Sequence, residues 1–183
     1  MFNSTPALSI ILSKLYLLYL FMIEVKKLSD DRWKDYQDLR LAALKSDPIA
    51  FGSSYEEEII ISEEEWKKRI KNTLFALLND KPIGMIVYIF DSKLKTKHVA
   101  NIFGVYVKKE YRGQGIGKKL IESAISLIKK NKNIVKIKLN VNPEQKATVK
   151  LYEKYGFKTV GMLKNELYIN GKFYDELIME KLV

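Results

Sequence analysis

The 183-residue sequence predicts a single α/β domain of the α+β type, built on a mixed seven-stranded sheet with a β-α-β crossover at its centre. Seven short apolar or alternating segments have the pattern of strands. Amphipathic segments with helical spacing separate several of them, and no repeat or long linker divides the chain. The expected strands are 23–28, 73–78, 83–90, 99–107, 134–141, 159–169 and 172–182.

Helix signals flank the early strands. Ser29 is expected to cap a helix that ends at Asp47-Pro48, because serine accepts a hydrogen bond from the first turn and proline cannot continue a helix. Ser62-Glu63-Glu64-Glu65 has the spacing of a capping box, which predicts a short helix toward Lys71.

The second half of the chain predicts the crossover. Residues 99–107 form an apolar strand, 116–130 carry an apolar stripe at helical spacing, and 134–141 alternate strictly. A further helix is expected over 147–155. Asn170-Gly171 is a strong hairpin signal between the last two strands.

Residues 1–21 form an apolar extension, and 22–183 form the expected domain. Lys14 interrupts the apolar run, and Met22 stands immediately before the first strand. We expect either that the native protein starts at Met22, or that the extension is a helix docked on the domain or a partner, or a membrane anchor. Amino-terminal sequencing of the native protein distinguishes these alternatives.

The charge is concentrated in one segment. Residues 108–158 contain thirteen Lys, one Arg and four Glu, which equals the whole net charge of +10. Such a concentration of positive charge attracts nucleic acid, a membrane surface or a multiply phosphorylated cofactor. The alternative is that the Lys side chains only form the solvent-exposed faces of helices. The absence of Cys excludes disulfides and a thiolate nucleophile, and the one histidine, His98, is too few for a histidine metal cluster. We therefore expect no metal, and a reducing, cytoplasmic location.

The central motif is Arg112-Gly113-Gln114-Gly115-Ile116-Gly117, between a strand and a helix. Glycines let the backbone approach an anion, and a helix start offers unpaired N–H groups. A dinucleotide fingerprint fails because its third glycine falls on Lys118, and a Walker loop fails because Lys119 replaces Ser or Thr. Two interpretations of the motif remain: a phosphate site with a different spacing, or a tight structural turn.

A second block, Leu151-Tyr152-Glu153-Lys154-Tyr155-Gly156-Phe157, follows the turn Asn142-Pro143-Glu144-Gln145. With the glycine loop, this block resembles the GCN5-related N-acetyltransferase (GNAT) family over roughly 23–183. The ending Tyr174–Glu180 and, more weakly, Phe51–Ser54 are also similar to family members. The resemblance implies a sheet covered by helices on both faces, and an enzyme that transfers acetyl from acetyl-CoA, its co-substrate, directly to a primary amine.

The resemblance also implies roles for individual residues. The pyrophosphate of coenzyme A would be held by Arg112, Gly113, Gln114, Gly115, Ile116 and Gly117. The pantetheine arm would pair with Val105, Tyr106 and Val107. Asn142 and Gln145 would lie in a coenzyme-contacting turn, with Gln145 in place of the family's usual Asn. Tyr152 would contact the coenzyme and act as the catalytic acid.

Gly104 interrupts an apolar strand, which indicates a bulge that would part this strand from its parallel neighbour and open a slot. The general base is left unassigned. Asn101 stands where some family members carry Glu, so a water chain or a carboxylate from elsewhere must serve. The carboxylate candidates are Glu56, Glu57 and Asp175.

Two other functions remain open at this point. The fold could serve a non-catalytic acyl-CoA-binding regulatory protein, or a basic nucleic-acid-binding module, although the sequence lacks the common nucleic-acid motifs. No nucleic-acid or membrane partner is expected, and a homodimer is possible by resemblance. The acceptor could be a small amine, a polyamine, an amino acid or a protein amino group. The six Glu within 56–65 would face either a cationic amine or solvent.

Overall fold

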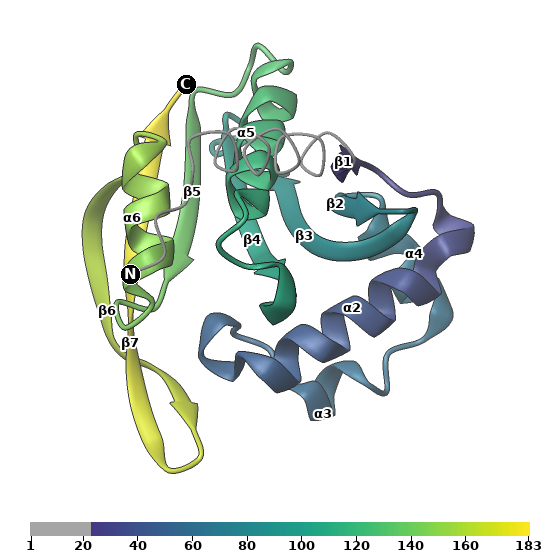
Figure 1. Ribbon diagram of the computed structural model, residues 1–183. Coiled ribbons are helices and arrows are strands. Elements are labelled where there is room, and N and C mark those ends of the chain that lie inside the picture. The colour runs from purple at the N-terminus through teal and green to yellow at the C-terminus, as the bar shows by residue number, and fades with distance from the viewer. Residues whose placement is uncertain (1–22) are drawn as a thin grey trace, which may run out of the picture.

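The computed structural model describes residues 23–183, which form one seven-stranded sheet in the order β1-β2-β3-β4-β5-β7-β6 (Figure 1). Neighbouring strands are antiparallel except β4 and β5, which are joined by the crossover helix. The mixed sheet with a central crossover is therefore confirmed, while the expected extension 1–21 lies outside the described residues. The strands are β1 (Ile23–Lys26), β2 (Thr73–Leu78), β3 (Lys81–Phe90), β4 (Val99–Val107), β5 (Lys136–Val141), β6 (Lys158–Ile169) and β7 (Lys172–Leu182).

Helices cover both faces of the sheet (Figure 1). The α-helices are α2 (Trp33–Ser46), α3 (Tyr55–Glu58), α4 (Glu63–Ile70), α5 (Ile116–Lys129) and α6 (Lys146–Lys154). Short 3-10 turns are η1 (Asp30–Arg32), η2 (Pro48–Ala50) and η3 (Lys109–Tyr111). α2 and α4 pack on one face, and α5 and α6 on the other, so the sheet separates two hydrophobic cores.

The core under α2 and α4 is built around aromatic side chains. The Tyr36 ring lies edge-on to Trp66 and Phe75, with centroids 5.3 and 5.7 Å apart. Trp66 and Phe75 are fully buried. Edge-on aromatic pairs stabilise a core beyond the area that they bury. These contacts anchor the first turn of α2 to α4 and β2.

The local signals at the helix starts differ from those expected. Ser29 makes no capping hydrogen bond, and η1 precedes α2. At Ser62 only half of the capping box forms: its hydroxyl accepts from the amide of Glu65. The full reciprocal box is at Ser54 and Glu57, where it starts α3. The turn Asn170-Gly171 forms a hairpin with positive φ angles of 50° and 82°, as expected.

A β-bulge in β4 divides the sheet into two halves. Met85 pairs with Tyr106 and Val87 pairs with Phe103, so Ile86 faces two residues of β4. Gly104 lies in this bulge with a φ of +56°, a conformation that L side chains rarely adopt. The parallel pairing of β4 and β5 ends at Asn101 and Lys138. The predicted bulge is confirmed, and beyond it the two strands separate.

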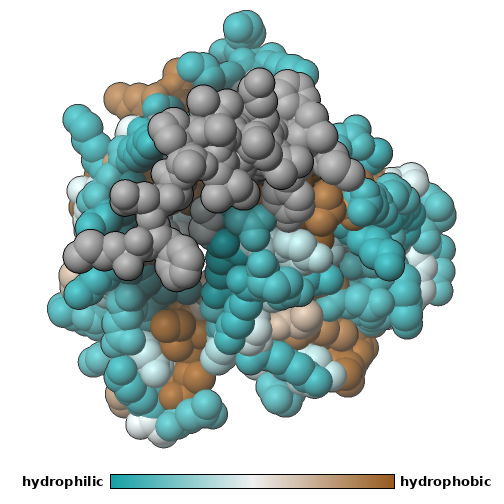
Figure 2. Space-filling view, viewed as in Figure 1, coloured by the Kyte–Doolittle hydropathy of each residue, from teal (hydrophilic) through white to brown (hydrophobic). Residues whose placement is uncertain are grey.

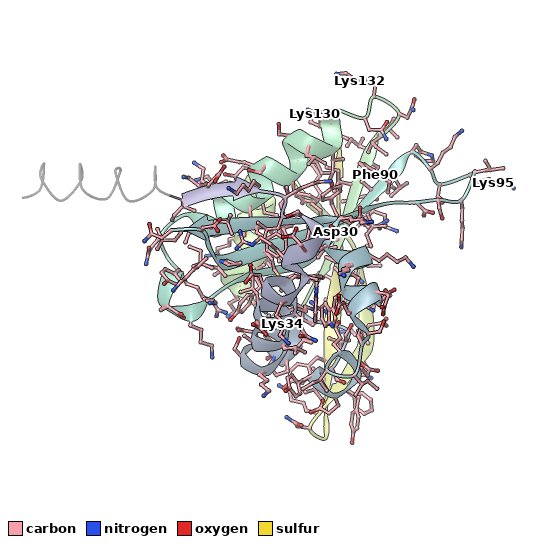
Figure 3. The ribbon with its side chains drawn as sticks, turned by 90° about the vertical axis from the view of Figure 1, so that its right-hand side faces the viewer. Asp30, Lys34, Phe90, Lys95, Lys130 and Lys132 are labelled. Atoms are coloured by element: carbon pink, nitrogen blue, oxygen red, sulfur yellow. The ribbon has the colours of Figure 1, made fainter. Side chains whose placement is uncertain are left out.

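Two extensions leave the body of the domain away from the β6–β7 hairpin tip. Figure 3 shows the β3–β4 loop reaching outward from Phe90 to Lys95, and Lys130 and Lys132 at the end of α5. Within residues 23–183, no helix is long and apolar enough to cross a membrane.

Candidate active site

A cavity of about 440 Å³ lies where β4 and β5 separate. Its walls come from the end of β4, the glycine loop with the start of α5, and one face of α6. Nine of the residues predicted from the sequence line it: Val105, Tyr106, Val107, Arg112, Gly113, Gly115, Ile116, Gly117 and Gln145. The structure therefore brings most of the predicted coenzyme residues into one concave site.

The glycine loop exposes a row of backbone N–H groups to this cavity. Gly113 and Gly115 have φ angles of +76° and +78°, and Gly115 is the N-cap of α5. Within the described residues, no amide from Gly113 to Lys118 donates to a protein acceptor. The helix dipole adds partial positive charge at the same place, so the loop is suited to hold an anion such as a diphosphate.

Arg112 occupies the loop in a fixed position. Its Nη1 and Nη2 donate to the two carboxylate oxygens of Asp47, at 3.1 and 2.7 Å, and its Nε donates to the carbonyl of Val107 at 2.8 Å. Burial acts to raise the pKa of Asp47, but hydrogen bonds from Arg112 and Ser46 outweigh it and hold that pKa below its usual value. The guanidinium thus joins the glycine loop to the end of α2, and the free donors of the loop are its amides.

Three predicted residues lie outside the cavity lining: Gln114, Asn142 and Tyr152. The side-chain Nε2 of Gln114 donates back to the carbonyl of Glu110 at 3.3 Å. Asn142 is buried; its Oδ1 accepts from the Glu144 amide at 2.8 Å, and its Nδ2 has no partner within the described residues. Asn142 thereby shapes the turn that presents Gln145.

Tyr152 lies directly behind the cavity wall. Its ring is buried against Phe157, with centroids 5.9 Å apart, while Thr148 and Leu151 of the same helix line the cavity. Burial raises the pKa of Tyr152, so its phenol keeps its proton throughout the physiological pH range. No described group is hydrogen-bonded to this hydroxyl, which leaves its proton available for a partner.

A second cavity, of about 720 Å³, lies between the segment after α2 and the β6–β7 hairpin. Three carboxylate side chains line it, from Glu56, Glu57 and Glu166, together with one cation, Lys45. Figure 2 shows a hollow between the hairpin and the α2–α3 side, with apolar side chains along its edge. The two cavities flank η2: Ala50 lines the first and Pro48 the second.

The candidate bases named from the sequence have different surroundings. Asn101, at the last β4–β5 pair, carries no carboxylate. The carboxylate of Glu57 accepts the Ser54 amide in its cap. Asp175 accepts from Lys164 Nζ at 2.8 Å and from the Asn165 amide at 2.9 Å, so it shapes the irregular part of β6. His98 is exposed at the end of the β3–β4 loop. Within residues 23–183, no group of acidic or histidine side chains could hold a metal.

Several lining residues were not anticipated. The sequence pattern predicted for Asp47 only a place at the end of a helix. Because its partner Arg112 is 65 positions away, no local pattern reveals the pair. Thr148 and Leu151 could have been found, since they follow Gln145 at the spacing of one helix face. Lys118 could have been found as the next residue of the same helix start.

Comparison with known proteins agrees with this geometry. The Acetyltransferase (GNAT) family model matches residues 26–157. The L-amino acid N-acetyltransferase AaaT of Escherichia coli is 24% identical over 126 residues, covering 66% of this chain and 77% of that protein. The spermidine N(1)-acetyltransferase of Thermoplasma acidophilum is 30% identical over 146 residues, covering 74% and 88%. Several other curated relatives are matched over about half of their length.

Solved structures share the fold. A GNAT-family acetyltransferase from Streptococcus pneumoniae superposes with a TM-score of 0.78 at 27% identity, covering 88% of this chain and 99% of that one. An acetyltransferase from Salmonella typhimurium, solved with acetyl-CoA, has a TM-score of 0.73 at 13% identity, covering 87% and 93%. With the family match spanning most of the chain and the parted strands beside a glycine loop, this protein belongs to the GNAT family of acetyltransferases.

Proposed function

We propose that the protein transfers an acetyl group from acetyl-CoA directly to a primary amine. The observation that carries the proposal is the cavity between β4 and β5, whose wall presents the unpaired amides of Gly113 to Lys118. Oriented amides at a helix start suit the diphosphate of coenzyme A. The segment 108–158, which contains the glycine loop, carries the excess of positive charge, and two of its cations, Arg112 and Lys118, line the cavity, which favours a multiply charged anion.

The parted strand provides the place for the thioester arm. Beyond Asn101, no described residue pairs with β4 on its β5 side, and Val105, Tyr106 and Val107 line the cavity there. An extended pantetheine arm can pair with such a free edge as an added strand does. A backbone N–H of this segment would then stabilise the oxyanion that develops on the thioester carbonyl.

Tyr152 serves as the general acid in this proposal. The leaving thiolate of coenzyme A needs a proton, and the buried phenol behind Thr148 and Leu151 holds one. Because the sequence contains no Cys, acetyl does not pass through an enzyme thioester. The neutral amine attacks the thioester carbon, the C–S bond breaks, and the nitrogen loses one proton and keeps the other as the N–H of the amide.

The second cavity is the proposed acceptor site. Its three carboxylates favour an acceptor with positive charge in addition to the reacting amine, such as a polyamine. The spermidine N(1)-acetyltransferase among the relatives supports this class. Amino acids and protein amino groups are the alternatives that the experiment below compares.

The test is an acetyl-CoA consumption screen at neutral pH across spermidine, putrescine, amino acids, a peptide amino terminus and an aminoglycoside. We expect turnover with at least one amine and the highest kcat/KM with a polyamine. In a parallel thermal-shift measurement, acetyl-CoA at about 100 times its Kd should stabilise the fold by roughly 2.7 kcal/mol, and duplex DNA should not. Stabilisation without turnover of any amine would favour a non-catalytic acyl-CoA-binding protein.

A further inference from the structure

Direct acetyl transfer requires a group that takes a proton from the acceptor. An alkyl ammonium has a pKa of about 10.4, so most of such an acceptor is protonated and non-nucleophilic at neutral pH. Of the bases considered from the sequence, Asn101 cannot accept a proton, and Asp175 is held by Lys164 and the Asn165 amide. Glu56 and Glu57 line the acceptor cavity but not the cavity beside β4, and Glu57 already accepts the Ser54 amide. The structure offers a different carboxylate, on β7.

We propose that Glu176 is the general base of the acceptor site, held in place by Asn140. This inference rests on the proposed function and names the group that its chemistry lacks. Glu176 Oε2 accepts a hydrogen bond from Asn140 Nδ2 at 3.0 Å. Its other carboxylate oxygen has no hydrogen bond to any described residue and is free to accept a proton.

The register of the sheet places Glu176 on the face of the sheet on which α2 packs. Leu139 and Met179 are paired across β5 and β7, and both belong to the core on the α5 face. Side chains alternate along a strand, so Asn140 and Glu176 project from the opposite face. That opposite face is the one on which α2 packs and on which β4 presents Phe103.

Glu176 is not in the lining of either cavity, but its neighbours in the sheet connect it to both the acceptor cavity and the opening beside β4. On one side, Leu167 lines the acceptor cavity and pairs with Tyr174, which is two residues before Glu176 on the same face of β7. On the other side, Asn140 belongs to β5, the strand that borders the opening beside β4. The hydrogen bond to Asn140 therefore holds the Glu176 carboxylate against β5, the strand that faces β4 across the opening.

Glu176 is partly exposed, as a base that exchanges protons with solvent must be.

In the proposed reaction, the acceptor nitrogen loses two protons. The acceptor ammonium gives one proton to the Glu176 carboxylate, directly or through one water, and the neutral amine attacks the thioester carbon. The C–S bond then breaks, Tyr152 protonates the sulfur, and the second proton lost by nitrogen restores the phenol. Glu176 returns its proton to water.

The experiment compares an amine with an aminooxy analogue of the same length, because the aminooxy nitrogen is already unprotonated at neutral pH. The first pair of acceptors is putrescine and 1-aminooxy-3-aminopropane. If another amine is a better substrate in the screen, that amine and its aminooxy analogue are used instead. Mass spectrometry identifies which nitrogen is acetylated. The variants are Glu176→Gln and a matched control, Glu180→Gln, on the same face of β7 and ion-paired with Lys136 at 3.0 Å.

For Glu176→Gln we expect kcat with the amine to fall about 100-fold, the effect of losing a general base. The rate at the aminooxy nitrogen should change less than about threefold, and the KM for acetyl-CoA should stay the same, because only deprotonation is impaired. Glu180→Gln should behave as wild type with both acceptors. Asn140→Leu should give a smaller loss that is again confined to the amine.

Full activity of Glu176→Gln with the amine would overturn the assignment and leave the acetyltransferase activity intact. An equal loss with both acceptors would also overturn it, since a base is not needed for the aminooxy nitrogen. Failure of the wild-type protein to acetylate any amine would overturn the proposed function itself, and this assignment with it.

Discussion

Arg112 and Asp47 form a two-pronged ion pair, 2.7 Å at its shorter contact, that joins the glycine loop to the end of α2. The hydroxyls of Ser46, beside Asp47, and Tyr106 are hydrogen-bonded at 3.2 Å, which ties the same helix end to β4. The loop that would receive the pyrophosphate and the segment that borders the acceptor cavity are thus held by one set of polar contacts.

Replacing Asp47 with Asn should loosen the loop. Removing one partner of this half-exposed pair is expected to lower the free energy of unfolding by about 1 kcal/mol, and to raise the KM for acetyl-CoA more than it lowers kcat. Urea unfolding and steady-state kinetics measure the two effects. Asp80→Asn is the control, since Asp80 pairs with Arg32 at 2.9 Å away from both cavities and should leave the KM unchanged.

Gly104→Ala should damage the bulge. A Cβ there would lie 3.3 Å from Arg40 Nη1 and from Val87 Cγ2, at a φ of +56°. We expect a loss of about 2 kcal/mol in the free energy of unfolding, with a raised KM for acetyl-CoA. Gly171→Ala shares the positive φ but has nothing within 4 Å, so its smaller loss isolates the backbone strain. Equal losses in the two variants would show that crowding at the bulge is unimportant.

The buried pair of Arg40 and Glu58 should make the fold sensitive to acid. Two hydrogen bonds, at 2.7 and 2.9 Å, join them, and the guanidinium stacks 4.5 Å from the Phe51 ring. Burial acts to raise the pKa of Glu58, but the hydrogen bonds from Arg40 outweigh it and lower that pKa. The stabilisation that the pair gives the fold is therefore fully present above the pKa of Glu58 in the unfolded chain, about 4.3. It is lost as the pH falls through the lower pKa of Glu58 in the folded protein.

Glu58→Leu should cost about 3 to 5 kcal/mol at pH 7, because it leaves the Arg40 charge buried and unpaired. The double variant Arg40→Met/Glu58→Leu should recover much of this loss. Urea midpoints at pH 7 and pH 3.5 provide the measurement, and the advantage of wild type over the double variant should shrink at the lower pH. A constant difference between the two pH values would contradict the assignment of acid sensitivity to this pair.

Tyr152→Phe should lower kcat by about 100-fold with little change in the KM for acetyl-CoA, because only protonation of the leaving thiolate is lost. The control is Tyr155→Phe in the next turn. The Tyr155 hydroxyl donates to Glu122 at 2.8 Å, outside the cavity lining, so its removal should cost stability and leave kcat unchanged. Equal kcat values for the two variants would assign Tyr152 a packing role only.

Local sequence patterns predicted the elements of the sheet well because each strand and each turn is specified by neighbouring residues. Gly104 predicted the bulge for the same reason, since a glycine in an apolar strand has a local backbone cause. Local patterns failed at the helix caps, where Ser54 and Ser62 carry the same Ser-x-x-Glu spacing but only Ser54 forms the reciprocal bonds.

The missed parts of the site depend on contacts between distant positions. Asp47 meets Arg112 across 65 residues, and Asn140 meets Glu176 across 36. The second contact requires the register of β5 on β7, which is set by the packing of whole strands. Sequence patterns therefore predicted most of the residues that line the first cavity, which stand in a few short segments, and left the proposed acceptor side open.

The short turn η2 is a wall shared by the two cavities. Asp47 and Ala50 face one cavity, while Pro48 and Phe51 face the other, so a shift of this turn that enlarges one space narrows its neighbour. Occupancy of either space then alters affinity in the other, and thermodynamic reciprocity makes the two effects equal in size. The Kd for acetyl-CoA measured with and without a non-reacting amine analogue gives that common factor directly.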